Sequence, residues 1–149
     1  MTLSLQEISD RVEIDDTITR YSYGLDQRKW EEWDRAFTPE AVIDFSAFGL
    51  EPHTPAELRE IFSAGDAKRI SGQHLLSNRL VFLDGDRASA HAEFSLVTLA
   101  RTDTPGTARR VRAGGWYEDD LVRTPSGWRI VARRGFPKSS EVVEIPWEG

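Results

Sequence analysis

Four strand-forming segments fill the second half of the chain, and no other sequence feature constrains the fold as strongly. Each segment is rich in β-branched and aromatic residues that alternate with polar ones, which is typical of a sheet with one covered face. The segments are residues 73–83, 88–100, 109–123 and 128–136. They are separated by three turn sequences, Asp84-Gly85-Asp86, Asp103-Thr104-Pro105-Gly106 and Thr124-Pro125-Ser126-Gly127. Short connections of this kind predict an antiparallel meander.

A long amphipathic helix is expected near the start of the chain. It begins at Ser4, where Glu7 three residues later completes a capping-box pattern, and it runs to about Leu25. Gly24 is expected to weaken its last turn. Apolar residues recur along it at near-helical spacing: Ile8, Val12, Ile14, Ile18, Tyr21 and Leu25. This spacing predicts one buried face.

A second helix, a strand and a third helix are expected before the sheet. Residues 29–37 repeat aromatic side chains every three or four positions, which is the period of a helix. Residues 41–48 alternate as a strand does and are followed by a glycine. Residues 54–64 open with a Thr-Pro pair, which is typical of a helix start.

Together these elements predict the α+β fold class, in which three N-terminal helices cover one face of an antiparallel sheet. A length of 149 residues suits one domain, and we assign residues 1–149 to it. Residues 137–149 are expected to form a C-terminal tail.

Charge and composition exclude several classes of partner and location. The net charge of −6 disfavours nucleic acids and anionic membranes, because both would be repelled. The chain has no cysteine, so disulfides and thiolate metal sites are excluded. Neither a signal-peptide pattern nor a transmembrane stretch is present. The expected location is therefore the cytoplasm.

Three local patterns resemble one known family. They are the run Tyr21-Ser22-Tyr23-Gly24-Leu25-Asp26 before Trp30, the run Phe37-Thr38-Pro39-Glu40-Ala41-Val42-Ile43-Asp44, and the closing hairpin Gly115-Trp116-Tyr117 to Gly127-Trp128-Arg129-Ile130. The chain resembles SnoaL-like proteins of the nuclear-transport-factor-2-like superfamily over about residues 5–136. This resemblance implies a cone-shaped α+β barrel with a curved sheet around a ligand cavity. The fold hosts many activities, so it does not by itself fix the function.

The resemblance also implies a catalytic pair, Asp26 and His74. Scytalone dehydratases and hexachlorocyclohexane dehydrochlorinases of this superfamily use an Asp and a His at similar points. An imidazole can accept a proton near neutral pH, and a buried carboxylate on its other nitrogen fixes the tautomer. The alternative is that Asp26 is a helix cap and His74 a structural residue.

Two further residues are candidates for the same site. The resemblance implies a cationic residue at Arg133, which could hold a leaving group, although arginines on such a strand are often solvated or paired. Tyr21 stands where the dehydrochlorinases are similar in having a polar residue, a lysine, so a leaving-group role for Tyr21 is one alternative and plain packing is the other.

The aromatic content of the chain suits a hydrophobic, cyclic ligand. The expected cavity walls are Phe45, Ile61, Phe94, Leu96 and Trp116. His91 is expected on the opposite face of its strand, and His53 in an exposed loop. The scattered histidines and the absence of a glycine-rich phosphate loop predict neither a metal nor another cofactor.

The sequence leaves three functions open. The first is a cofactor-independent lyase, dehydratase-like, or isomerase that acts on a small hydrophobic organic substrate. The second is a polyketide cyclase or an epoxide hydrolase, in which the acidic residue would be central. The third is a non-catalytic small-molecule-binding module. We also expect a homodimer or homotrimer, because the convex sheet face is too apolar to remain exposed to water. Alternating apolar residues are expected on that face: Val97, Leu99, Val111 and Ala113.

Overall fold

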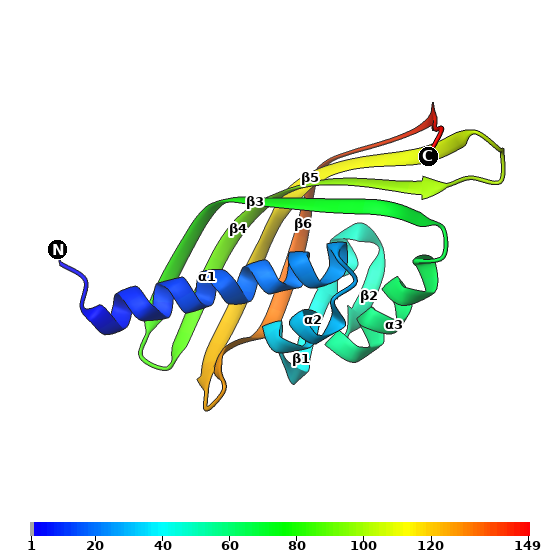
Figure 1. Ribbon diagram of the computed structural model, residues 1–149. Helices are drawn as coiled ribbons and strands as arrows, with labels where there is room; N and C mark the ends of the chain where they lie inside the picture. Colours follow the sequence, from blue (N-terminus) through cyan, green and yellow to red (C-terminus); the bar gives the residue numbers. More distant parts are fainter. Residues whose placement is uncertain (1) are drawn as a thin grey trace.

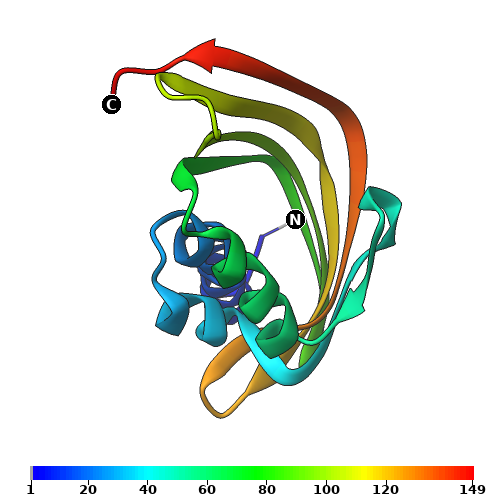
Figure 2. The same ribbon diagram turned by 90° about the vertical axis from the view of Figure 1, so that its right-hand side faces the viewer.

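A strongly curved six-stranded sheet wraps around the helices, as the two views of the computed structural model show (Figures 1 and 2). The structure describes residues 2–149. The elements in chain order are α1 (Leu5–Asp26), α2 (Trp30–Ala36), β1 (Phe37–Phe45), the 3-10 helix η1 (Ser46–Phe48), β2 (Leu50–His53), α3 (Pro55–Gly65), β3 (Arg69–Asp84), β4 (Arg87–Arg101), β5 (Thr107–Thr124) and β6 (Gly127–Pro146). None of the helices in the described part is both long and apolar enough to span a bilayer.

The strands follow one another in the order β2-β1-β6-β5-β4-β3. Strands β3 to β6 form the predicted antiparallel meander. β1 joins the other side of β6 in parallel, with Val42 opposite Ala132. The sheet is therefore open, with β2 and β3 as its edges, and the predicted α+β class is confirmed.

Several strands differ from the sequence prediction, and β2 was not predicted. β1 begins at Phe37, directly after α2, and β6 continues to Pro146 instead of ending at Phe136. The far end of β6 pairs with β5, because Pro146 lies opposite Thr107. The sequence did not predict this continuation because proline usually ends a strand. Pro137 is accommodated here at the point where the β5–β6 register shifts.

Helix caps fix where α1 and α3 begin. Ser4 accepts a hydrogen bond from the Glu7 N–H while the Glu7 carboxylate accepts one from the Ser4 N–H, so the predicted capping box is present. Thr54 and Glu57 repeat the arrangement at α3, with Pro55 in the first turn. These two helices therefore start at positions set by their own sequences.

The core lies between α1, α2 and the concave side of the sheet. Ile14, Ile18 and Tyr21 of α1 are fully buried there, as is Trp33 of α2. The indole N–H of Trp33 donates to the Pro55 carbonyl at 3.2 Å and so ties α2 to the start of α3. This packing sets the three helices against one end of the sheet.

Strand pairing decides which residues share the concave face. Ala113 lies opposite Leu96 and Val111 opposite Thr98, and directly paired residues point to the same side. The expectation that Val111 and Ala113 belong to the convex face is therefore wrong. Ala113 lines the cavity on the concave side.

Candidate functional site

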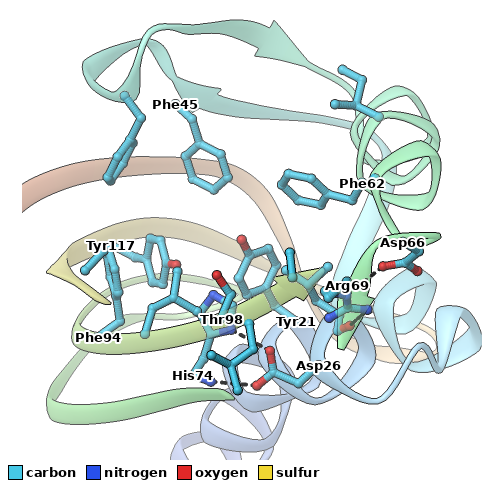
Figure 3. A pocket seen from close by; sticks show the side chains of 18 residues that line it. Tyr21, Asp26, Phe45, Phe62, Asp66, Arg69, His74, Phe94, Thr98 and Tyr117 are labelled. Carbon is cyan, nitrogen blue, oxygen red and sulfur yellow. Dashed lines mark hydrogen bonds and ion pairs between the residues drawn. The ribbon is translucent and has the colours of Figure 1, made fainter. Parts of the chain in front are cut away.

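Asp26 and His74 are in direct contact in the wall of a cavity (Figure 3). Asp26 is the last residue of α1, and His74 lies in β3 on the concave side. One Asp26 oxygen, Oδ1, is 2.7 Å from His74 Nδ1, and the other, Oδ2, accepts the His74 backbone N–H at 2.6 Å. The two side chains are 9% and 6% exposed. The carboxylate thus holds both the ring and the backbone of the histidine.

This contact decides how the imidazole can act. A carboxylate only accepts hydrogen bonds, so the proton of a neutral His74 ring lies on Nδ1 and is donated to Asp26. Nε2 then carries a lone pair and can take up a proton. The arrangement can therefore serve as a general base, with Asp26 as the group that orients it.

The cavity has a volume of about 430 Å³ and is only partly enclosed. Four of the five predicted wall residues line it, namely Phe45, Ile61, Phe94 and Leu96. Other aromatic and aliphatic residues extend this apolar wall: Leu25, Phe48 and Phe62. The volume and the lining suit a small hydrophobic molecule.

Trp116 does not line the cavity, contrary to the prediction. Successive residues of a strand point to opposite faces, and it is Tyr117 that faces the cavity. The Trp116 ring stacks instead on Phe136, with 4.9 Å between the ring centroids. Because positions 116 and 117 are both aromatic, composition alone could not decide which of them faced inward.

Arg133 is completely buried but is absent from the cavity lining. Its Nε and Nη2 each donate to one oxygen of Asp119 at 2.7 Å. Its guanidinium lies against the rings of both Tyr21 and Tyr117, 4.3 and 4.4 Å from their centroids. Burial acts to lower the pKa of Arg133, but Asp119 outweighs it and the pKa is raised. The Arg133 guanidinium therefore packs against both tyrosine rings outside the cavity lining.

Tyr21 and Tyr117 both line the cavity and remain protonated. Burial raises the pKa of Tyr21 to about 12 and holds the pKa of Tyr117 well above its ordinary value. The Tyr21 ring is also 6.0 Å from the His74 ring, centroid to centroid. Two protonated phenols thus line the cavity, and Tyr117 is one that the sequence did not predict.

A second polar group lies in the cavity wall close to α3. Arg69 and Asp66 both line the cavity, and Arg69 Nε donates to Asp66 Oδ1 at 2.7 Å. Arg28 reaches the same carboxylate, with its Nε 3.4 Å from Asp66 Oδ2. The sequence did not predict these residues, because arginines and aspartates at a loop are usually solvated and carry no signal of their own.

The other two histidines lie away from the dyad. His91 is opposite Glu118 on β5, on the face that points away from the cavity, and His53 has its Nδ1 3.9 Å from a Glu57 oxygen. Within residues 2–149 there is no group of three His, Asp or Glu side chains placed to hold a metal ion.

A family model described as SnoaL-like domain matches residues 6–134. The chain belongs to the SnoaL-like family. It is also 39% identical over 133 residues to an uncharacterized protein of Mycobacterium tuberculosis, an alignment that covers 88% of this chain and 87% of the relative. The resemblance to this family is therefore confirmed.

Solved structures with the same fold carry diverse descriptions. A protein of Novosphingobium aromaticivorans described as an aromatic ring hydroxylase is 27% identical, with a TM-score of 0.77 and coverage of 91% and 94% of the two chains. A protein of the same organism described as a scytalone dehydratase is 16% identical (TM-score 0.77, coverage of 90% and 87%). A hexachlorocyclohexane dehydrochlorinase is 13% identical (TM-score 0.77, 93% and 92%). The last two show the nuclear-transport-factor-2-like fold alone.

Proposed function

We propose that the protein is a cofactor-independent lyase of the dehydratase type, or an isomerase, acting on a small hydrophobic molecule. The contact between Asp26 Oδ1 and His74 Nδ1 at 2.7 Å, inside an apolar cavity, carries this proposal. A paired, mostly buried histidine of this kind is a typical general base. The descriptions of the dehydratase and dehydrochlorinase neighbours agree with it.

The proposed reaction begins at the free nitrogen of His74. Nε2 takes a proton from a carbon next to a carbonyl group, and Asp26 stabilises the imidazolium that forms. The electron pair of the broken C–H bond forms the carbon–carbon double bond as the C–O bond to a neighbouring hydroxyl breaks. His74 returns its proton to that hydroxyl, which leaves as water. Return of the proton to a different carbon would instead give an isomer.

The two phenols have a supporting role in this scheme. Tyr21 and Tyr117 donate hydrogen bonds to the oxygen on which negative charge develops. Arg133 touches both rings from the side away from the ligand, and its charge works against the rise in the pKa of Tyr21 that burial causes. In this proposal Arg133 is a positioning residue and does not contact the leaving group.

The test is proton exchange at carbon, which does not require the natural substrate. The metal-free protein is incubated in D₂O with a panel of cyclic and aromatic β-hydroxy ketones, while NMR follows loss of the C–H signal and growth of the alkene. We expect exchange or elimination that His74→Ala slows by about 10²–10⁴-fold, the usual contribution of a general base. His91→Ala, a histidine on the other face of the sheet, is the matched control and keeps the parent rate.

Retained ligand binding without any exchange, in the parent and in His74→Ala alike, would contradict the lyase and isomerase proposal. The cavity would then belong to a non-catalytic binding module. An epoxide hydrolase or cyclase would instead depend on Asp26 far more than on His74. Both oxygens of Asp26 already bind His74, which disfavours that alternative.

A further inference from the structure

The guanidinium of Arg69 is held on two sides and open on the third. Its Nε donates to Asp66 Oδ1 at 2.7 Å, and its Nη2 donates to the Leu25 carbonyl oxygen at 2.9 Å. Nη1 makes no hydrogen bond to any residue in the part of the chain that the structure describes. Because the side chain is only 14% exposed and lines the cavity, its orientation is fixed and the free N–H groups belong to the cavity wall.

The open edge of Arg69 lies in the same corner of the cavity as the dyad. A Cβ atom placed on Gly72 would be 3.1 Å from Arg69 Nη1 and 3.4 Å from Asp26 Oδ1, so the two groups border the same point. Figure 3 shows Arg69, Asp26 and His74 on the side of the cavity that faces away from Phe45. A ligand atom bound at Nη1 would therefore lie close to Asp26, the carboxylate partner of the base.

Two carboxylates lie near Arg69, but neither of them binds its open edge. Arg28 and Arg69 both contact Asp66, and Asp26 accepts hydrogen bonds from His74, so Nη1 is left for another acceptor. Much of the remaining cavity wall is apolar and includes the rings of Phe45, Phe62 and Phe94. This combination suits a ligand with one anionic end and one hydrophobic end.

We propose that Arg69 determines specificity by binding an oxyanion, a carboxylate or a phenolate, on an otherwise apolar ring-bearing substrate. The free Nη1 holds the oxyanion next to the dyad, while the ring lies against the phenylalanines. This inference names the substrate class of the proposed lyase or isomerase and rests on that function for its role in catalysis. The binding itself can be tested without turnover.

The test compares two fluorescent probes that differ in one acidic group. They are 1-anilinonaphthalene-8-sulfonate, which has a sulfonate, and N-phenyl-1-naphthylamine, which is its neutral counterpart. Both are titrated into the parent and into Arg69→Gln. We expect the variant to bind the sulfonate probe at least tenfold more weakly, because a hydrogen bond to a charged group is lost, and the neutral probe within about twofold of the parent.

Two variants separate Arg69 from general effects of charge. Arg79→Gln removes the same charge from the same strand outside the cavity, and it should bind both probes like the parent. Arg69→Lys keeps the charge but loses the planar set of N–H donors that a guanidinium provides. Its affinity for the sulfonate probe should therefore lie between those of the parent and Arg69→Gln. If Arg69→Gln binds neither probe, the comparison is made with Arg69→Lys instead. An equal loss of affinity for both probes in Arg69→Lys would then overturn the proposal.

Other results would also overturn the assignment of Arg69. These are no binding of the sulfonate probe by the parent, or equal weakening of both probes in Arg69→Gln. The outcome is independent of the base, because His74→Ala should keep the tenfold effect. A preserved probe effect without proton exchange on any substrate would thus refute the proposed lyase and leave the anion-binding role of Arg69 standing.

Discussion

A single carboxylate sets both the direction and the protonation of His74. Asp26 accepts the backbone N–H and the ring N–H of the same residue, so the ring cannot turn without breaking the pair. Because the base is already oriented by these two hydrogen bonds, its side chain does not have to be ordered when a ligand binds. At the scale of one residue, the site is therefore prepared in advance.

The tautomer of His74 can be measured directly. We expect long-range ¹H–¹⁵N spectra above the pH at which the ring is protonated to show a proton on Nδ1 and a bare Nε2. In Asp26→Asn the side-chain amide can rotate and donate to the ring, so the fraction with a bare Nε2 should fall. Equal tautomer populations in the parent and the variant would contradict the proposed role of Asp26.

The buried pair of Arg133 and Asp119 makes a strong prediction about stability. Arg133→Met leaves the Asp119 carboxylate buried without its partner, and urea unfolding should show a loss of about 3–5 kcal/mol. The double variant, with Asp119→Leu added, removes both charges and should recover most of that loss. A double variant as unstable as the single one would show that packing of this side chain against the two tyrosines matters more than charge.

At the scale of elements, Asp10 fastens the first half of α1 to the end of the sheet. Its carboxylate accepts from Arg123 Nη1 at 2.6 Å and from the Trp128 indole N–H at 3.1 Å. Asp10 is itself buried, and the hydrogen bond from Arg123 is the main reason that its pKa lies well below the ordinary value. One helix and two strands thus depend on this carboxylate being ionised.

The stability of the fold should therefore depend on Asp10 in acid. A carboxyl whose pKa is lowered by folding stabilises the native state above its unfolded pKa, about 3.9, and this contribution is lost as the pH falls below about 4. We expect Asp10→Asn to be less stable than the parent in urea at pH 7, and the difference to shrink toward pH 3. Asp103→Asn, an exposed control, should show no such trend.

Gly24 allows α1 and α2 to pack closely, a role that its sequence context does not indicate. A Cβ at Gly24 would lie 2.6 Å from the backbone nitrogen of Trp33, so α2 can approach α1 closely only because the side chain is missing. Gly24→Ala should destabilise the protein by about 1–3 kcal/mol, although alanine favours a helix by about 1 kcal/mol. Gly65→Ala, which meets nothing within 4 Å, should be neutral or stabilising when thermal unfolding is followed by circular dichroism.

At the scale of the whole molecule, local patterns predicted the elements but not their relative placement. The capping box at Ser4 and the turn between β3 and β4 are local, so the sequence was sufficient for them. Tyr117 and Arg69 reach the cavity through strand register and loop packing, which no local pattern reports. Asp26 and His74 were paired by family resemblance, since nothing in a separation of 48 residues implies contact.

The convex face also carries a prediction about assembly. Leu75 and Phe82 of β3 lie on this face and are more than half exposed, and we expect such a surface to be covered by another copy in a homodimer or homotrimer. Light scattering after gel filtration should give a multiple of 16.9 kDa. Leu75→Glu with Phe82→Glu should give monomers, whereas Val142→Glu, on the concave side of β6, should not. A monomeric parent at tens of micromolar would contradict this expectation.

The parallel pairing of β1 with β6 has a consequence for how the chain is made. Phe45, which forms part of the cavity wall, belongs to strand β1, and the partner residues of this strand, Ala132 to Arg134, are synthesised 90 residues after the residues they pair with. Until those residues leave the ribosome, β1 has its β2 neighbour alone, and the apolar side chains of the first helices have an incomplete sheet to cover. Because such distant contacts form slowly, the nascent protein should pass through an aggregation-prone interval in which chaperones would have the most to protect.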